Sequence, residues 1–334
     1  DIPLAGRVAP HKLPAASRNL LFCKELFQSA SRQVNVMASK FSHKLPEEHL
    51  YEGILFFGFS PPETLDAVKD FQVRDDDVFI VTYPKAGTTW LQEIVWLIMH
   101  DGDFKCAAKD PVYFRCPFLE FKDDVLHEVG IDLANPMPSP RVIKSHLPVK
   151  LMPRQLFQNH KGKILLLFRN PKDICVSYYH FYRSSSSLGN FRGSFHEFLR
   201  MFAEGHVDHG SWFDFTRSWW SKRHESNVYI IFYEDMQRDL KQCIIKLCEF
   251  LNKPLSENLV DRIVEHSSFE SMSMNPMTNH LDVYSINSKI SPQLRKGIVG
   301  DWKSHFTVGQ NEIFDKIYEE KMGDVNIPFL YELE

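Results

Sequence analysis

The sequence predicts an α/β fold, a single domain with a mostly parallel central sheet, helices on both faces and a P-loop-like anion-binding loop. Three observations predict it. Short continuous apolar runs, typical of strands buried on both faces, alternate with segments of helical periodicity. One such run is followed by a turn with lysine, glycine and two threonines, and then by a helix pattern. With 334 residues, 43% of them hydrophobic, the chain can bury a substantial core.

The first strand and helix lie on either side of this turn. The segment 75–84, "DDDVFIVTYP", holds a continuous apolar run and predicts a buried parallel strand. The segment 88–101, "TTWLQEIVWLIMHD", follows it with helical spacing. Its apolar positions are Trp90, Leu91, Ile94, Val95, Ile98 and Met99.

Three further strands and three further helices continue the alternation, which predicts a parallel sheet covered on both faces. Pro171 stands in the first turn of one of these helices, a favoured place for proline. Residues 101–140 and 184–194 are predicted to be loops, and loops at strand ends shape binding sites. The predicted strands are 141–148, 161–171 and 227–236, and the predicted helices are 171–183, 239–252 and 257–269.

The N-terminal segment 1–36 differs from the rest of the chain. It is rich in Arg, Ser and Ala, and its only acidic residues are Asp1 and Glu25. This composition is similar to that of a transit peptide. The alternative is that Met37 is the true start and that the leader is upstream sequence. Either interpretation predicts little stable fold in 1–36 and one domain over 37–334.

Composition bears on which partners the protein can bind and on the cellular compartment in which it is found. The net charge of −4 gives no overall basic field for nucleic acid or an anionic membrane. No apolar run approaches the roughly 20 residues that a membrane span needs. The six cysteines show no CxxC spacing, and Cys175, Cys243 and Cys248 lie in helix-like patterns. We therefore expect free thiols and a cytoplasmic protein. We expect no metal, because the sequence shows no cluster with metal-ligand spacing.

The turn in "YPKAGTTW" predicts an anion site. A strand that turns into a helix exposes backbone N–H groups at the helix N-terminus. Gly87 lets the backbone approach a ligand, Thr88 and Thr89 add hydroxyl groups, and Lys85 adds a charge. The order differs from G-x-x-x-x-G-K-[ST], which disfavours a P-loop kinase or NTPase. Taken alone, the turn could equally be structural.

Two more basic stretches complete the pattern. In "RNPKDICVS", Arg169 stands at a strand's C-terminal end, where open α/β sheets bind ligands, and Ser177 follows about two helical turns later. In "LRKGIVGDWK", Arg295 and Lys296 precede Gly297. Each alone could be a surface salt bridge or a solvated loop.

Together, the three stretches resemble the cytosolic sulfotransferases. "YPKAGTTW" is similar to that family's 5′-phosphosulfate loop, "RNPKDICVSYYHFY" to its 3′-phosphate strand and helix, and "RKGIVGDWKSHFT" to its C-terminal nucleotide loop. "VIKSHLP", "YEDM" and "NPMTN" stand in the family's order. The resemblance extends from about Pro46 to the C-terminus, and several separated motifs carry it.

The resemblance implies a fold, a donor and a reaction. The family's mostly parallel sheet agrees with the strand and helix pattern. The donor would be 3′-phosphoadenosine 5′-phosphosulfate (PAPS), and the product adenosine 3′,5′-bisphosphate. The sulfonate would pass to a hydroxyl or amine of a small lipophilic acceptor such as a phenol, steroid or alcohol. The resemblance assigns the 5′ end to Lys85, Ala86, Gly87, Thr88, Thr89 and Trp90, the 3′-phosphate to Arg169, Ser177, Arg295, Lys296 and Gly297, and the adenine to Tyr233, Ser267, Phe269 and Met272.

The chemistry follows from residue types. Sulfonate transfer, like phosphoryl transfer, is catalysed by stabilising the charge that develops in the transition state more than by forming covalent bonds to the protein. Lys85 and Lys144 can neutralise charge that grows on the bridging oxygen. His146, two residues after Lys144, has a reference pKa suited to a general base. A non-catalytic family member that binds nucleotide or a lipophilic ligand is the alternative, and the presence of these residues argues against it.

The acceptor pocket is less determined. Phe118, Phe121 and Phe181 match aromatic positions that wall the family's pocket, although alone they would be ordinary core aromatics. The chain departs from the family at a few positions. Ala86 replaces a common serine, which removes a hydroxyl donor from the cradle. Gln293, Pro61 and Pro62 stand where aromatics are frequent, and these three put the acceptor, not the donor, in doubt.

The segment 303–312 resembles the family's short dimerisation segment, K-x3-T-V-x3-E. Lys303, Thr307, Val308 and Glu312 carry the match. The same residues predict a helix N-cap at Thr307, and both interpretations can hold. So short a segment would make a small interface, so any homodimer would be weak.

Overall fold

A computed structural model describes residues 41–123 and 128–333 of the chain. The described residues from His43 onward belong to one compact unit. The predicted leader, 1–36, lies outside the described residues. The fold described below is that of this unit.

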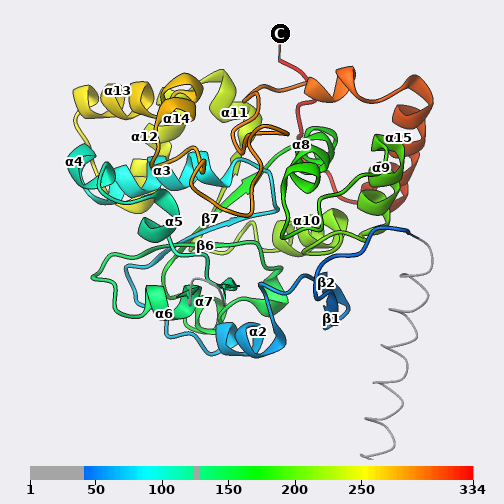
Figure 1. Ribbon diagram of the computed structural model, residues 1–334. Coiled ribbons are helices and arrows are strands. Elements are labelled where there is room, and N and C mark those ends of the chain that lie inside the picture. The colour runs from blue at the N-terminus through cyan, green and yellow to red at the C-terminus, as the bar shows by residue number, and fades with distance from the viewer. Residues whose placement is uncertain (1–40, 124–127, 334) are drawn as a thin grey trace, which may run out of the picture. The chain divides into compact units, whose positions relative to one another are not determined.

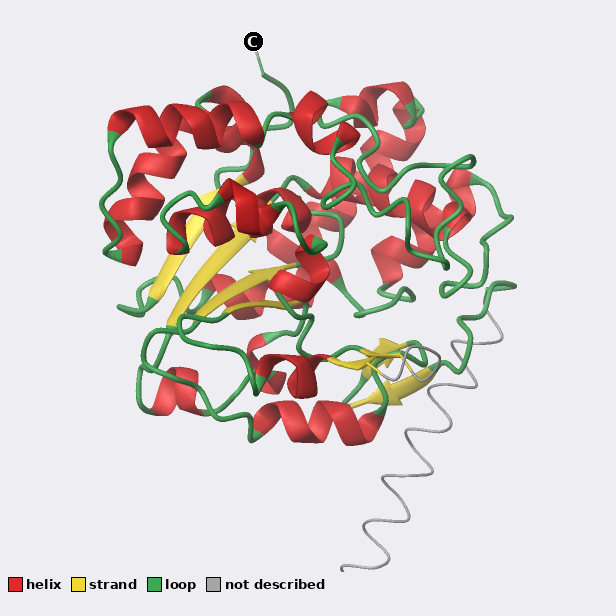
Figure 2. Cartoon of the chain, turned by 60° about the vertical axis from the view of Figure 1, so that its left-hand side comes forward, coloured by secondary structure: helices red, strands yellow, loops and turns green. Residues whose placement is uncertain are grey.

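A four-stranded parallel sheet forms the centre of this unit (Figures 1 and 2). The strand order is β6-β3-β7-β8, and every neighbouring pair is parallel. The strands are β3 (Val78–Thr82), β6 (Val142–Ser145), β7 (Lys163–Phe168) and β8 (Val228–Phe232). All four lie within the predicted strand segments, so the predicted parallel α/β sheet is confirmed.

One face of the sheet packs on α3 (Thr88–Met99), α12 (Leu240–Leu251) and α13 (Glu257–His266), which lie together in Figure 1. Each of these helices was predicted, and α13 ends three residues before the predicted segment does. Because side chains alternate along a strand, every second residue of β3 and β7 joins these helices in one core. The strand residues of this core are Val78, Ile80, Val142, Leu165, Leu167 and Ile231.

The opposite side of the unit holds α8 (Pro171–Ser184), α9 (Phe195–Glu204), α10 (Trp212–Trp220) and α15 (Val308–Met322). Helix α8 begins with proline at its first position, as predicted, and the Asn170 side chain caps it by accepting from the backbone N–H of Asp173. The capping box of Thr307 and Gln310 opens α15, which confirms the predicted N-cap. The ring of Tyr83, at the end of β3, packs edge-on against Tyr178 of α8 and Phe215 of α10.

Two predicted boundaries were wrong. Residues 101–140 are not one loop, because short helices and a hairpin pack beside the sheet there. The predicted strand 227–236 ends at Phe232, and its last residues begin α11. The elements not yet named are β1 (His49–Tyr51), β2 (Ile54–Phe56), α2 (Pro62–Lys69), α4 (Phe104–Ala107), α5 (Val112–Arg115), β4 (Lys122–Asp123), β5 (Glu128–Val129), α6 (Gly130–Ala134), η1 (Val149–Leu151), α7 (Gln155–Gln158), α11 (Tyr233–Arg238), α14 (Phe269–Met274) and η2 (Asp301–Ser304).

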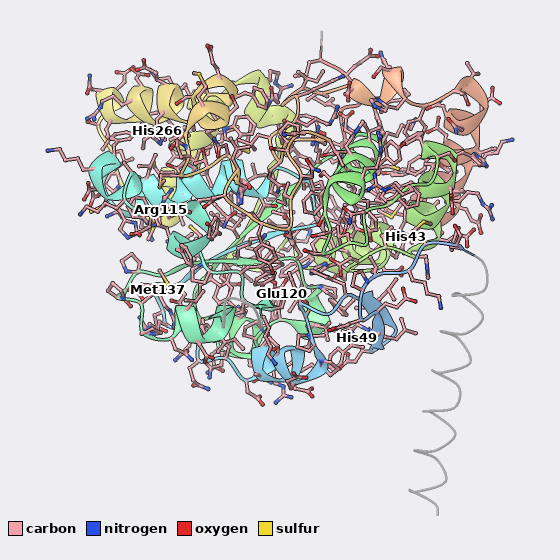
Figure 3. The ribbon with its side chains drawn as sticks, in the orientation of Figure 1. His43, His49, Arg115, Glu120, Met137 and His266 are labelled. Atoms are coloured by element: carbon pink, nitrogen blue, oxygen red, sulfur yellow. The ribbon has the colours of Figure 1, made fainter. Side chains whose placement is uncertain are left out.

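Buried ion pairs join the starts of two strands and hold three helices together. Arg141, just before β6, donates from Nε and Nη2 to the two carboxylate oxygens of Asp77, just before β3, at 2.7 and 2.5 Å. Glu93 of α3 accepts from Arg115 of α5 at 2.5 Å and contacts His266 of α13 at 2.9 Å (Figure 3). Both carboxylates are fully buried, so each depends on its partners.

Three findings bear on the wider predictions. The cysteines within the described residues are free thiols: Cys106, Cys116, Cys175, Cys243 and Cys248. In the same residues, no helix is long and apolar enough to cross a bilayer. Nowhere in residues 41–123 and 128–333 do three or more His, Cys, Asp or Glu side chains come together in a way that could hold a metal ion.

Candidate active site

A cavity of about 650 Å³ opens at the carboxyl ends of the parallel strands. The chain enters it after each strand, with Lys85 after β3, His146 after β6, Arg169 after β7 and Tyr233 after β8. This is the edge at which open α/β sheets bind ligands. The sequence-predicted residues that line it are Lys85, Gly87, Thr88, Thr89, Trp90, Phe118, Phe121, Lys144, His146, Arg169, Ser177, Phe181, Tyr233, Phe269, Met272, Arg295, Lys296 and Gly297.

The remaining predicted residues lie elsewhere. Ala86 is fully buried beneath the turn, and Ser267 is buried behind the cavity. The Ser267 carbonyl accepts a hydrogen bond of 2.8 Å from the indole N–H of Trp90, so Ser267 holds a residue of the cavity wall in place. Lys303 pairs with Glu332 on the surface, and none of the four predicted dimer residues lines the cavity.

The turn between β3 and α3 has the shape that an anion-binding loop requires. Lys85 has φ 69° and Gly87, the N-cap of α3, has φ 109°, so two left-handed residues reverse the chain. A Cβ on Gly87 would lie 2.7 Å from the ring of Tyr233, so only glycine fits there. Thr88, Thr89 and Trp90, the first residues of α3, line the cavity, so the positive end of the helix dipole lies at its wall.

Lys85 is surrounded by other cations. Its Nζ donates to the Gln293 side chain at 3.0 Å and lies 4.2 Å from the centre of the Phe181 ring. Burial, with the charges of Lys144, Arg169 and Arg295, lowers the pKa of Lys85 to about 7. The expectation that Gln293 concerns only the acceptor is corrected here, because Gln293 contacts the lysine assigned to the donor.

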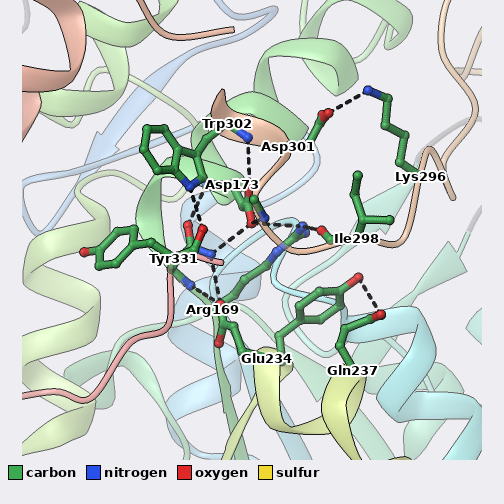
Figure 4. A network of polar contacts seen from close by, with 12 residues as sticks. Arg169, Asp173, Glu234, Gln237, Lys296, Ile298, Asp301, Trp302 and Tyr331 are labelled. Carbon is green, nitrogen blue, oxygen red and sulfur yellow. Dashed lines mark hydrogen bonds and ion pairs between the residues drawn. The ribbon is translucent and has the colours of Figure 1, made fainter. Parts of the chain in front are cut away.

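Arg169 joins three parts of the cavity wall (Figure 4). It donates to the backbone oxygens of Lys85 and Ile298 at 3.2 and 3.0 Å, and its guanidinium lies 4.1 Å from the centre of the Tyr233 ring. Its Nε is buried and finds no hydrogen-bond partner in the described chain. A buried, unpaired N–H at a cavity wall fits an anionic ligand.

In the loop around Gly297, Arg295 and Lys296 both pair with Asp301, a residue that the sequence analysis did not single out. Asp301 contacts Arg295 and Lys296 at 2.6 Å each. Burial opposes ionisation of Asp301, but the hydrogen bonds from Lys296 and Arg295 outweigh it and lower its pKa to about 2. Gly297 has φ 64°, and a Cβ there would lie 2.2 Å from the Phe269 ring. Phe269 therefore packs directly against this loop.

His146 has a fixed orientation. Its Nδ1 is 2.8 Å from the carbonyl oxygen of Thr82 and 3.0 Å from that residue's hydroxyl, which in turn is 2.7 Å from the Thr88 hydroxyl. A carbonyl oxygen only accepts, so Nδ1 carries the proton and Nε2 keeps a lone pair. Burial, with the charges of Lys144 and His209, holds the pKa of His146 well below its usual value.

The acceptor side is mostly aromatic. The rings of Phe118 and Phe121 stack 5.7 Å apart, and Phe59 packs edge-on against Phe121 at 5.0 Å. Lys144 lies with Nζ 3.8 Å from the centre of the Phe118 ring, and burial lowers its pKa to about 8. Phe57 and Phe59 line the cavity, whereas Pro61 and Pro62 at the start of α2 do not. The sequence analysis therefore missed these two aromatics, and it also missed Tyr113, Phe114, Tyr178 and Tyr284, which line the same cavity.

The fold and this cavity define an α/β protein in which two groups of basic side chains, a histidine and an aromatic wall meet at the carboxyl edge of the sheet. Residues 75–326 match the family model described as the sulfotransferase domain. Sulfotransferase 1C2 of Rattus norvegicus is 45% identical over 268 residues, which are 80% of this chain and 90% of that protein. Sulfotransferase 1E1 of Homo sapiens is 44% identical over 270 residues, with 80% and 91% covered. The chain belongs to the sulfotransferase family.

Solved structures agree. Mouse sulfotransferase SULT7A1 complexed with PAP is 31% identical, with TM-score 0.69, over 83% of this chain and 95% of that one. Retinol dehydratase in a complex with retinol and PAP is 28% identical, with TM-score 0.73, over 84% and 90%. PAP is adenosine 3′,5′-bisphosphate, the product that PAPS leaves. The predictions of family, fold, sulfotransferase activity and PAPS as donor are confirmed. The roles of individual residues stay predictions.

Proposed function

We propose that this sulfotransferase moves the sulfonate of PAPS to a hydroxyl of a small lipophilic acceptor, with His146 as general base. One observation carries the proposal: hydrogen bonding fixes the tautomer of His146, and His146 lines the same cavity as Lys85 and Lys144. The acceptor oxygen bonds to sulfur while the bond from sulfur to the bridging phosphate oxygen breaks. The acceptor proton passes to Nε2 of His146, and adenosine 3′,5′-bisphosphate leaves.

The residues proposed to bind PAPS form two groups, one at its 5′-phosphosulfate and one at its 3′-phosphate. Lys85 and the N–H groups of α3 would hold the 5′-phosphosulfate, and Lys144 would face the transferred group from the end of β6. These two cations stabilise charge that develops on the bridging oxygen. Arg169, Ser177 and the loop 295–297 would hold the 3′-phosphate. The unpaired Nε of Arg169 supports this assignment.

The aromatic walls support a lipophilic acceptor. Ring faces bind flat or greasy molecules with little conformational cost. Retinol dehydratase binds androsterone in one solved structure and retinol in another, which are molecules of this kind. We propose phenols, steroids and alcohols as the classes to test, with hydroxyl acceptors before amines.

We further propose that the protein is cytoplasmic and forms a weak homodimer through 303–312. The free thiols support a reducing compartment. Val308 in the first turn of α15 is 77% exposed, which leaves an apolar side chain for a second copy to cover. Sedimentation of wild type and Val308→Glu over a concentration range tests the dimer. A purely monomeric wild type would contradict it.

The test of the base uses His146→Ala. We expect turnover to fall by about 10² to 10⁴-fold, the usual effect of losing a positioned base. Affinity for adenosine 3′,5′-bisphosphate should stay at the wild-type level, because His146 faces the acceptor. The acceptor must have a pKa well above the assay pH, since an ionised phenol needs no base. The exposed His224→Ala serves as a matched control. Wild-type turnover in His146→Ala would show that His146 is not the base.

A further inference from the structure

The Lys85 ammonium has one hydrogen-bond acceptor in residues 41–123 and 128–333, the side-chain oxygen of Gln293, at 3.0 Å. Both residues line the cavity, and their contact joins the turn after β3 to the loop that follows α14. Lys85 has a role in the proposed function, whereas Gln293 has none there. The contact therefore raises the question of what Gln293 does for this lysine.

Contacts on both sides of Gln293 hold its loop in place. Before it in the chain, the backbone N–H of Asn287 donates to the carbonyl oxygen of Ser184, at the end of α8, at 2.7 Å. After it, Arg295 pairs with Asp301 at 2.6 Å. The fold therefore fixes the backbone on either side of the contact with the lysine.

The charged neighbours of Lys85 oppose its positive charge. The titratable groups whose charges interact with that of Lys85 are Lys144, Arg169, Arg295, His146 and His280. None of these supplies a negative charge, and burial together with the three cations lowers the pKa of Lys85 to about 7. A hydrogen bond to the charged form of a group favours that form. Gln293 therefore favours the ammonium, as does the face of the Phe181 ring, 4.2 Å away.

We infer that Gln293 is a positioning residue, whose side-chain oxygen holds Lys85 as an ammonium at the 5′ end of the donor and stays bonded to it when the nucleotide binds. The inference rests on the proposed function, because that function places Lys85 at the 5′ end. An ammonium has three N–H groups, so Lys85 can keep its bond to Gln293 and still donate to a phosphate oxygen. Loss of the Gln293 oxygen should therefore weaken nucleotide binding only where Lys85 must gain a proton to bind.

The test is calorimetry of adenosine 3′,5′-bisphosphate with wild type and Gln293→Leu, at pH 6 and at pH 8. With a pKa of about 7, Lys85 of the free protein is about 91% charged at pH 6 and about 9% charged at pH 8. One hydrogen bond to a charged group corresponds to about one pKa unit, or about tenfold. We expect Gln293→Leu to weaken binding by about tenfold at pH 8 and by less than about twofold at pH 6. Lys144 and the nucleotide's phosphates titrate in both proteins, so the comparison at each pH cancels them.

Proton uptake at pH 7 is a second measurement, which a merely structural role of Gln293 would not change. Lys85 should take up about 0.5 proton in wild type and about 0.9 in Gln293→Leu. Gln293→Glu keeps an oxygen at the same reach and adds negative charge, so its uptake should fall below that of wild type. Gln158→Leu, at an exposed glutamine of α7, should match wild type in affinity and uptake. Thermal unfolding confirms that each variant folds.

Three outcomes would overturn the inference. An equal loss of affinity at both pH values would mean that Gln293 only shapes its loop. Tighter binding by Gln293→Leu at pH 6, with unchanged affinity at pH 8, would mean that Gln293 releases Lys85 when the nucleotide binds. Unchanged affinity at both pH values would mean that the contact has no effect. Because these measurements follow binding alone, absence of sulfonate transfer from PAPS would overturn the proposed activity without altering their result.

Discussion

Proton uptake on nucleotide binding is the sharpest consequence of the crowded cations around Lys85. In the free protein the pKa of Lys85 is about 7, and that of Lys144 about 8. Burial lowers both pKa values, and for Lys85 the charges of Lys144, Arg169 and Arg295 add to it. A bound phosphate places negative charge beside these lysines and so favours their protonated form, which raises the pKa of each lysine. Nucleotide binding is therefore expected to take up protons. The uptake should be seen at a pH above the lowered pKa, where the lysine of the free protein is mostly neutral.

The magnitude follows from these values. At pH 8, a lysine of pKa about 7 is about 9% protonated, so Lys85 takes up about 0.9 proton when its pKa rises past 10. Lys144 can add up to about 0.5 at the same pH. The nucleotide adds little of its own, because a phosphate monoester with a second pKa near 6 is already fully ionised.

The assay is titration calorimetry of adenosine 3′,5′-bisphosphate at pH 8 in buffers of different ionisation enthalpy. The slope of apparent enthalpy against buffer enthalpy gives the protons taken up. Lys85→Met should lose about 0.9 proton relative to wild type. The exposed Lys241→Met should match wild type. A wild-type slope of zero at pH 8 would show that Lys85 is charged before the nucleotide binds, and would refute the argument.

Two further predictions concern glycine and a buried ion pair. Gly297→Ala should weaken binding of adenosine 3′,5′-bisphosphate by about tenfold in calorimetry, because the new methyl group must displace Phe269 and the backbone is strained at positive φ; unchanged affinity would show that this loop does not touch the ligand. Asp77→Ala should lower the free energy of unfolding in urea by about 3–5 kcal/mol, because it leaves Arg141 charged and buried. Asp235→Ala, which removes a solvent-accessible ion pair with Arg238, is the control, and it should lower the free energy of unfolding by about 0–1 kcal/mol. Equal losses in the two variants would contradict the account.

The sequence predicted well which of the residues assigned to the donor line the cavity, because these residues stand close together within short motifs. The turn from β3 into α3 places Lys85, Gly87 and the threonines within a few residues of one another. The strand and helix patterns on either side are long and strongly periodic. Arg169 directly follows β7, so strand order alone brings it to the same edge of the sheet.

The acceptor side could not be predicted in the same way. His209 and Asp208, which line the cavity, lie in a loop between α9 and α10 with no motif around them. Gln293 reaches Lys85 across about 200 residues, and only the packed fold shows that contact. Contacts of this kind depend on tertiary packing, which short sequence patterns do not encode.

The most direct test of the central claim is transfer of radioactive sulfonate from labelled PAPS to a panel of phenols, steroids and alcohols by the full chain. We predict a labelled sulfate ester of at least one acceptor, with one adenosine 3′,5′-bisphosphate released for each ester formed. Tight binding of the bisphosphate without transfer to any member of the panel would contradict the claim, and would favour a non-catalytic binding protein.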